Sequence, residues 1–167
     1  MKKSIFNQTA LKKAANKKPL LFNYTEDNNV IIWNTSGTFV IKCSKLLFEI
    51  EIQNALPTEQ KEQPTCINET FAAFNENSTI LTETFLTLDL QDNRTGRIYH
   101  NYKYKYLTIV DIGLLKILNN SITYTPYQFK ENRAILYKND IASCIIMPLW
   151  NEGIKEKITT LAEGLKN

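Results

Sequence analysis

A chain of 167 residues can form one domain with a hydrophobic core, or at most two small ones. Its apolar content of 43% and charged content of 22% are ordinary for a globular protein. No apolar run approaches the ~20 residues of a membrane span, and the N-terminal lysines precede no continuous apolar segment. We therefore expect a cytoplasmic protein without a secretory signal and with no membrane contact.

The cysteines and the charges narrow the function classes further. Cys43, Cys66 and Cys144 lie far apart without CxxC spacing, so we expect reduced thiols and no metal site. The formal net charge of +3 hides an asymmetry, because residues 1–18 hold six lysines and no acidic residue. The remaining chain has 14 basic and 17 acidic residues, a net charge of −3. Attraction to a polyanion is therefore expected at one end of the molecule.

The basic N-terminal segment favours a helix near residues 8–18, with Pro19 as its stop. Its exposed face would carry Lys12, Lys13, Lys17 and Lys18. Two interpretations are equally open. The lysines could face nucleic acid, or they could be the solvated end of a helix.

Short strands are predicted next, at residues 20–24, 30–33 and 38–42, separated by polar turns at 26–29 and 34–37. Residues 45–52 add an apolar run that alternates like a strand, with Glu49 and Glu51 on one face.

Residues 55–77 are expected to be a linker, because prolines, glutamines and glutamates dominate 55–68 and only a helical turn is suggested at 71–74. Residues 79–90 alternate as a strand. Residues 49–92 contain nine acidic residues and one basic residue, Lys61, which argues against phosphate contact in the middle of the chain.

The segment 99–150 predicts the order strand, helix and three strands. Over 99–106 a mostly aromatic face alternates with a mostly polar one, which indicates a half-buried strand; His100, Tyr102, Tyr104 and Tyr106 alternate with Tyr99, Asn101, Lys103 and Lys105. A helix near 110–119 follows, with Asp111 at its start and Lys116 on its surface. Further strands are expected at 121–125, 133–138 and 141–147, and Pro148 ends the last of them.

The C-terminal segment 151–167 predicts an amphipathic helix. Its narrow apolar seam consists of Ile154, Ile158, Leu161 and Leu165. Docking of this seam onto the chain's own sheet is the favoured interpretation, and contact with a partner is the alternative.

No catalytic motif is found in the sequence, so we expect a protein that is not an enzyme and that needs no cofactor. His100 stands between tyrosines in a predicted strand, where packing is a better explanation than proton transfer. Arg94, Arg97, Lys103 and Lys105 are interleaved with tyrosines, a pattern that can hold single-stranded nucleic acid. Sheet-core tyrosines opposite solvated lysines are the favoured interpretation.

The order of the elements and a few local motifs resemble one domain of the bacterial DNA polymerase sliding clamp. Tyr106-Leu107 precedes the predicted helix with Leu114-Leu115, and Ile145-Ile146-Met147-Pro148 ends the last strand, as in that family's last domain. Residues 33–41 resemble a clamp strand turn but lack its Asp and Arg. The resemblance implies one α+β domain over 1–150, with halves at about 1–54 and 78–150. Each half would be β-α-β-β-β, with antiparallel sheets and helices packed on one side.

The same resemblance implies a non-catalytic, DNA-associated accessory protein of DNA replication. Duplex DNA would be bound by Lys12, Lys13, Lys17, Lys18 and Lys116. One domain cannot encircle DNA, so a ring would need self-association. The alternative is a protein-interaction module on a clamp-like scaffold. It would act through the seam of the C-terminal helix on a second copy or a replication protein, without binding DNA.

Overall fold

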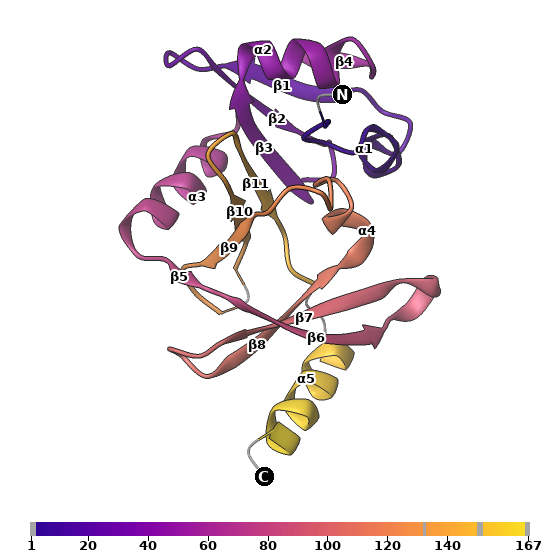
Figure 1. Ribbon diagram of the computed structural model, residues 1–167, viewed down its shortest axis with the longest axis vertical. Helices are drawn as coiled ribbons and strands as arrows, with labels where there is room; N and C mark the ends of the chain where they lie inside the picture. Colours follow the sequence, from indigo (N-terminus) through magenta and orange to yellow (C-terminus); the bar gives the residue numbers. More distant parts are fainter. Residues whose placement is uncertain (1–2, 132, 150–151, 166–167) are drawn as a thin grey trace.

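The computed structural model describes residues 3–131, 133–149 and 152–165 (Figure 1). The first part contains α1 (Gln8–Ala15), β1 (Leu20–Tyr24), β2 (Asn29–Trp33), β3 (Phe39–Ser44), α2 (Lys45–Phe48), the π-helical turn η1 (Glu49–Gln53) and β4 (Thr58–Gln60). Next come α3 (Thr65–Glu76), β5 (Thr79–Ile80), β6 (Thr82–Asp89), the 3₁₀ turn η2 (Gln91–Asn93), β7 (Thr95–Asn101) and β8 (Tyr106–Asp111). The last part contains α4 (Ile112–Leu115), β9 (Thr125–Gln128), β10 (Ile135–Lys138), β11 (Ala142–Ile146) and α5 (Glu152–Leu165).

The strands form two sheets. The larger sheet has the order β4-β1-β2-β3-β11-β10-β9-β5, and the smaller one has the order β6-β7-β8. Every pairing between neighbouring strands is antiparallel except that of β1 with the short β4. The predicted α+β class with antiparallel sheets and a C-terminal helix is confirmed. The pairing of β3 with β11 joins strands from the first and second halves of the chain in one sheet.

The larger sheet is covered on both faces. Alternate side chains of each strand point to opposite sides, so each face presents its own set of apolar residues. On one face, Ile32 and Ile41 pack in a core that also receives Leu11 of α1 and Phe48 of α2. On the other face, residues of β2, β3, β10 and β11 pack against α3. Figure 1 shows α3 and α1 on opposite sides of this sheet. The expectation of helices on one side only is therefore corrected by α3.

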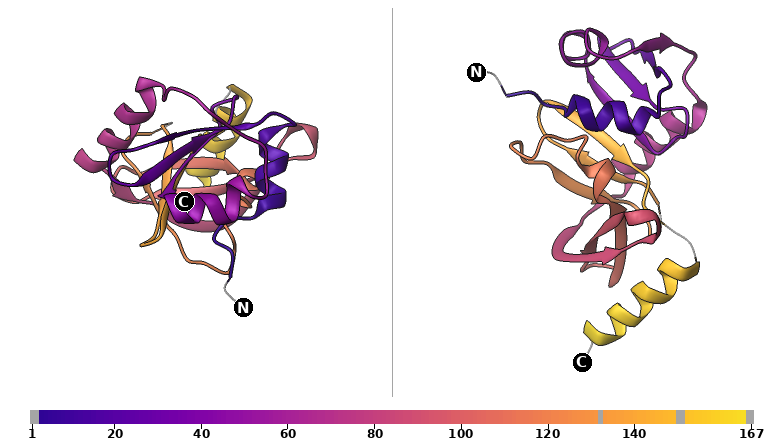
Figure 2. Two further views of the ribbon diagram at one scale, coloured as in Figure 1. Left: turned by 90° about the horizontal axis from the view of Figure 1, so that it is seen from above. Right: turned by 90° about the vertical axis from the view of Figure 1, so that its right-hand side faces the viewer.

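One face of the smaller sheet is covered by α5, and the other face contributes Tyr99 and Val110 to the core that α4 also contacts. Ile154 and Ile158 of α5 pack against Ile98 of β7 and against Leu107 and Ile109 of β8. The right-hand view of Figure 2 shows α5 at the end of the molecule farthest from α1 and α2.

The prediction of a strand over 45–52 was wrong, since this segment forms α2 and η1. The Ser44 hydroxyl accepts a hydrogen bond from the Leu47 amide and begins the helix. Phe48 and Ile52, four residues apart, then point into the core together. Helical geometry also turns the Glu51 carboxylate toward the N-terminal segment, where it accepts hydrogen bonds from the amides of Ile5 and Phe6.

The linker expected over 55–77 contains the twelve-residue helix α3. The composition of 55–68 suggested a mobile connection, but Ile67 and Phe74 are buried against the larger sheet. This apolar burial stabilises a helix that the polar residues around it do not predict.

Two boundaries in the second half also differ from the prediction. The single strand expected over 99–106 is a hairpin of β7 and β8, with its turn at residues 102–105. The helix expected near 110–119 is limited to α4, because residues 106–111 pair with β7 as a strand. The third strand from the end was predicted at 121–125 and lies at 125–128.

Candidate functional site

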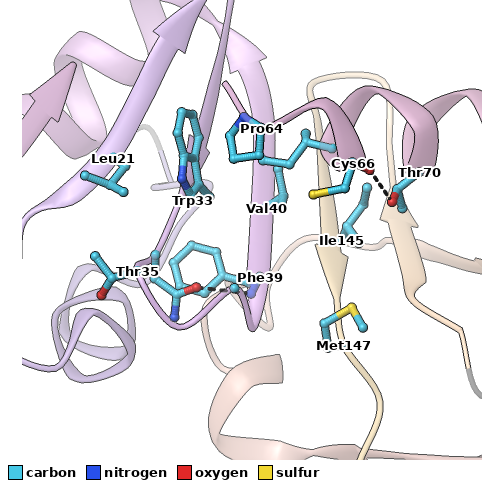
Figure 3. A pocket seen from close by; sticks show the side chains of 13 residues that line it. Leu21, Trp33, Thr35, Phe39, Val40, Pro64, Cys66, Thr70, Ile145 and Met147 are labelled. Carbon is cyan, nitrogen blue, oxygen red and sulfur yellow. Dashed lines mark hydrogen bonds between the residues drawn. The ribbon is translucent and has the colours of Figure 1, made fainter. Parts of the chain in front are cut away.

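An apolar pocket of about 320 Å³ lies between the first three strands, α3 and the end of β11 (Figure 3). Its apolar walls are formed by Leu21, Trp33, Phe39, Val40, Ile67, Ile145 and Met147. These residues come from β1, β2, β3, α3 and the end of β11, so the pocket exists only in the folded chain.

The turn between β2 and β3 forms one wall of the pocket and is held by a buried amide. The side-chain oxygen of Asn34 accepts a hydrogen bond from the Thr38 amide at 3.0 Å. Its nitrogen donates to the hydroxyls of Ser36 and Thr38, both at 2.8 Å, and to the Ala14 carbonyl at 3.2 Å. Asn34 therefore fixes the turn and ties it to the end of α1.

The opposite wall is the first turn of α3. Pro64 precedes the helix, and Ile67 is buried against Trp33 and Ile31. Cys66 is exposed at the pocket rim, and its carbonyl accepts a hydrogen bond from the Thr70 hydroxyl at 2.7 Å (Figure 3).

The end of β11 closes the pocket. The Met147 amide donates to the Thr38 carbonyl at 3.0 Å, which joins this end to the turn between β2 and β3. The Met147 side chain stays 44% exposed. A thioether is flexible and polarizable, so it can adapt to apolar groups of different shapes.

The side chains that line this pocket favour binding of an apolar group. Its lining includes no carboxylate, imidazole or amine, and its one thiol is that of Cys66 at the rim. Apolar walls with a few amide and hydroxyl groups are typical of sites that take apolar side chains or small molecules.

The lysines predicted to bind nucleic acid are all exposed. Lys12 and Lys13 lie on α1, Lys17 and Lys18 follow its end, and Lys116 follows α4. The start of α1 and the end of α4 lie together, because the Asn7 amide donates to the Ile117 carbonyl at 2.8 Å. No ion pair involves these five lysines over the described residues.

A polar groove of about 630 Å³ lies at this junction of α1 and α4. Gln8, Thr9, Lys116, Asn119 and Asn120 are among its lining residues. The groove places Lys116 beside the amino end of α1, where backbone amides carry a partial positive charge.

The predicted partner seam of α5 is mostly turned inward. Ile154 and Ile158 are buried against the smaller sheet, and Leu161 is partly buried there. The side chain of Leu165 lies outside the described residues. The favoured interpretation was that this seam docks onto the chain's own sheet, and the contacts of Ile154 and Ile158 agree with it.

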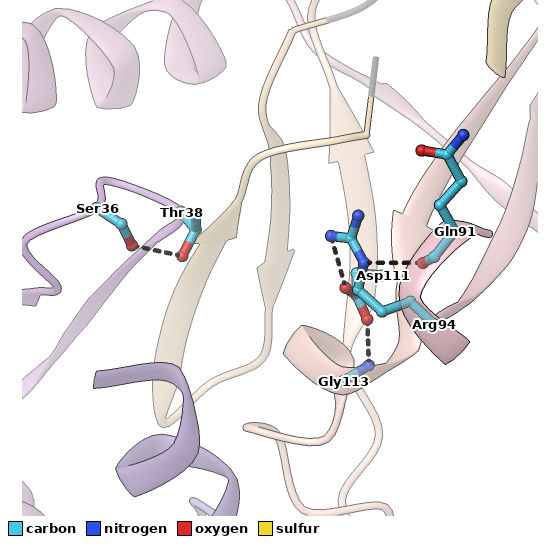
Figure 4. A network of polar contacts seen from close by, with 6 residues as sticks. All are labelled: Ser36, Thr38, Gln91, Arg94, Asp111 and Gly113. Atoms are coloured by element: carbon cyan, nitrogen blue, oxygen red, sulfur yellow. Dashed lines mark hydrogen bonds and ion pairs between the residues drawn. The ribbon is translucent and has the colours of Figure 1, made fainter. Parts of the chain in front are cut away.

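The basic and aromatic residues of β7 and β8 divide into two groups. Tyr99 and Tyr106 are buried, as core tyrosines are. Arg97 pairs with Glu83 at 3.1 Å, and Arg94 pairs with Asp111 at 3.7 Å (Figure 4). Sheet-core positions were also expected for Tyr102 and Tyr104, which is wrong because both lie on the exposed turn.

Cys43 and Cys144 are buried and Cys66 is exposed. Burial, followed by the nearby Glu51 carboxylate, raises the pKa of Cys43 to about 12. Burial also raises the pKa of Cys144. Within the described ranges, no group of His, Cys, Asp and Glu side chains could hold a metal ion, and no helix is long and apolar enough to cross a membrane.

Sequence reasoning missed Trp33, Ile67 and Met147 as wall residues of one pocket. Trp33 and Met147 were noted only as strand ends, and Ile67 lay within the expected linker. For two of them a signal was available, since Trp33 precedes the turn at Asn34 and Met147 precedes Pro148.

No protein-family model and no curated protein matches the chain. A solved structure of DNA polymerase III subunit beta from Borrelia burgdorferi, in complex with a natural product, matches with 13% sequence identity and a TM-score of 0.35. The match covers 90% of this chain and 65% of that protein. At these values the likeness is a weak one and concerns the fold alone.

Proposed function

We propose that this chain is a non-catalytic protein-interaction module that binds a short apolar segment of a partner protein. The observation that carries the proposal is the pocket between Trp33, Ile67 and Met147. It replaces the α5 seam as the site of contact, because Ile154 and Ile158 already pack within the chain.

The shape of the pocket favours side chains of a peptide. Its volume of about 320 Å³ lies at the small end of ligand sites, which suits a few apolar side chains. Thr35 and Met147 line the pocket and are exposed, so a peptide can continue past the pocket on this side. Burial of apolar surface would supply the binding free energy.

A pair of matched variants tests this proposal. Met147→Lys puts a charge into the pocket at a side chain that is 44% exposed, so the fold should tolerate it. Ile141→Lys makes the same kind of change beyond the other end of β11, at a side chain that is 55% exposed.

The probe is a library of random peptides displayed on phage, selected on the unaltered protein. Selected peptides should share two or more apolar residues, should bind in calorimetry, and should lose at least tenfold in affinity for the Met147→Lys variant only. Selected peptides that bind both variants equally, or a failure to enrich any peptide, would refute the pocket as a protein-binding site.

A second candidate function is sequence-independent binding of duplex DNA. It is favoured by the exposed, unpaired Lys12, Lys13, Lys17, Lys18 and Lys116 around α1 and α4 within the described chain. Such contacts release counterions, so affinity should fall steeply with salt.

The double variant Lys12→Glu/Lys13→Glu tests this candidate against Lys155→Glu/Lys157→Glu on the exposed side of α5. In a fluorescence titration with a labelled duplex at low salt, the α1 variant should lose affinity and flatten the salt dependence. Equal losses in both variants would show diffuse attraction to net charge, and no measurable binding by the unaltered protein would exclude the candidate.

A further inference from the structure

The turn between β7 and β8 displays two tyrosines and two lysines in solvent. Tyr102 is 67% exposed and Tyr104 is 49% exposed, although large aromatic side chains are usually covered. Lys103 and Lys105 alternate with them and are also exposed. No ion pair of the described chain involves either lysine.

The backbone of this turn is fixed from below by Asn101, which is fully buried. Its side-chain oxygen accepts a hydrogen bond from the Tyr104 amide at 3.1 Å. Its side-chain nitrogen donates to the hydroxyls of Thr79 at 2.7 Å and Tyr106 at 3.1 Å. The Asn101 carbonyl also accepts from the Lys105 amide at 2.7 Å. The turn is therefore a rigid platform.

The aromatic rings are held by their neighbours as well. The ring of His100 meets that of Tyr102 edge-on, with 4.1 Å between the ring centroids. The Lys103 ammonium lies 5.1 Å from the centroid of the Tyr104 ring. Lys105 adopts a φ of 57°, a left-handed conformation that a lysine rarely takes.

The charge around the turn favours an anionic partner. Residues 94–110 contain four basic residues and no acidic one. Arg94 and Arg97 are paired with Asp111 and Glu83, so the free positive charge is concentrated on Lys103 and Lys105. One acidic residue, Glu131, lies near this region. The pKa of Tyr106 is raised mainly by burial and in smaller part by the Glu131 carboxylate.

We propose that this turn binds single-stranded nucleic acid, with bases stacked on Tyr102 and Tyr104 and phosphates beside Lys103 and Lys105. Exposed rings stack on any unpaired base, and adjacent lysines neutralise the backbone. Bases in a duplex are already stacked on each other, so the rings discriminate in favour of a single strand.

This site is independent of the peptide pocket and of the α1 lysines. In Figure 1 the turn between β7 and β8 lies at the lower left, whereas α1 lies at the upper right. A preformed platform loses little conformational freedom on binding, which favours affinity from few contacts.

The test measures fluorescence anisotropy of a labelled oligothymidine strand and of a duplex of equal length. Tyr102→Ala/Tyr104→Ala removes both rings. The loss of each ring should weaken binding of the single strand by about fivefold or more. Tyr102→Phe/Tyr104→Phe keeps the rings and should bind normally. The control is Tyr24→Ala, because Tyr24 is 40% exposed and also lies near a lysine, with the Lys45 ammonium 5.3 Å from its ring centroid.

The lysines have a separate readout. Lys103→Gln/Lys105→Gln should reduce the slope of log affinity against log salt by about 1.4, the value for two single-strand phosphate contacts. The proposal is overturned if the unaltered protein does not bind the single strand. It is also overturned if the Tyr→Ala pair binds normally, if Tyr24→Ala loses as much, or if the duplex shows the same loss. Lys12→Glu/Lys13→Glu should leave the single-strand affinity nearly unchanged even where it abolishes duplex binding.

Discussion

Phe85 combines two unusual properties in one residue. Its side chain is 85% exposed, and its φ of 60° lies in the left-handed region that bulky residues avoid. It belongs to a bulge of β6, where the register with β7 shifts between Glu83 and Thr87. The Thr84 hydroxyl supports the bulge by donating to the Ile98 carbonyl at 2.8 Å. A bulge on this edge strand hinders pairing with another chain.

Replacing Phe85 with Asn should raise the free energy of unfolding by about 0.5–1 kcal/mol, since Asn tolerates a positive φ and no buried contact is lost. Urea denaturation measures the change. Leu86→Asn is the control, because Leu86 is also exposed but is not among the residues of positive φ. A stability of Phe85→Asn below that of the unaltered protein would contradict strain at this position.

Asn34 is the residue on which the shape of the pocket depends. It is 2% exposed and accepts from the amides of Thr38 and Phe39. Asn34→Ala should lower the free energy of unfolding by about 1–3 kcal/mol, because buried amides lose their acceptor. Peptides selected on the unaltered protein should also bind this variant less well.

Thermal denaturation and peptide titration check both effects. Asn54→Ala, at an exposed asparagine, should change stability by less than about 0.5 kcal/mol. Normal stability of Asn34→Ala would mean that the turn is held by other contacts.

At the scale of elements, α5 covers one face of the smaller sheet. Ile98 and Ile109, which are 1% and 0% exposed, pack in one cluster with Ile154 and Ile158 of this helix. The helix is therefore a structural part of this sheet.

Ile158→Ala should lower the free energy of unfolding by about 2–4 kcal/mol, through lost burial and the cavity that remains. Thr160→Ala is the matched control on the exposed side of the same helix. Urea denaturation followed by circular dichroism compares the two. Equal stability of both variants would show that the seam of α5 does not hold the sheet in solution.

At the scale of the whole molecule, buried ionisable groups link stability to pH. Cys43 has a pKa raised from 9.0 to about 12 in the folded protein, mainly by burial. Cys144 is affected in the same direction by burial alone. Burial also raises the pKa of Tyr99 and Tyr137. All four groups stay protonated in the folded chain at pH values where the unfolded chain ionises.

The free energy of unfolding should therefore be pH-independent with respect to these thiols below pH 9 and should fall from pH 9 to 12. The sign follows from linkage, since the unfolded chain then binds fewer protons than the folded one. Each thiol can contribute a slope of up to about 1.4 kcal/mol per pH unit.

Denaturant titrations across this range measure the slope. It should be smaller in Cys43→Ala/Cys144→Ala and unchanged in Cys66→Ala, because Cys66 is exposed. An unchanged slope in the double variant would contradict ionisation of these thiols on unfolding.

The sequence by itself determined the elements whose pattern is local. β1, β2 and β3 lie within one or two residues of the predicted strands, because alternation and polar turns act over a few neighbouring residues. The helices α1 and α5 likewise follow from their composition and apolar spacing. The exposure of Lys12 and Lys13 on α1 also follows from that local pattern.

Only the tertiary structure decided which apolar residues share a face and a pocket. Residues 45–52 alternate like a strand but are helical, because Phe48 and Ile52 must enter the same core. Tyr102 and Tyr106 fall on one face of the predicted alternation, yet Tyr106 is buried and Tyr102 is exposed at a turn. Trp33, Ile67 and Met147 meet because β3 pairs with β11 and α3 covers that face. A local pattern fixes the direction of a side chain along its element, but its environment is set by distant segments that pack against it.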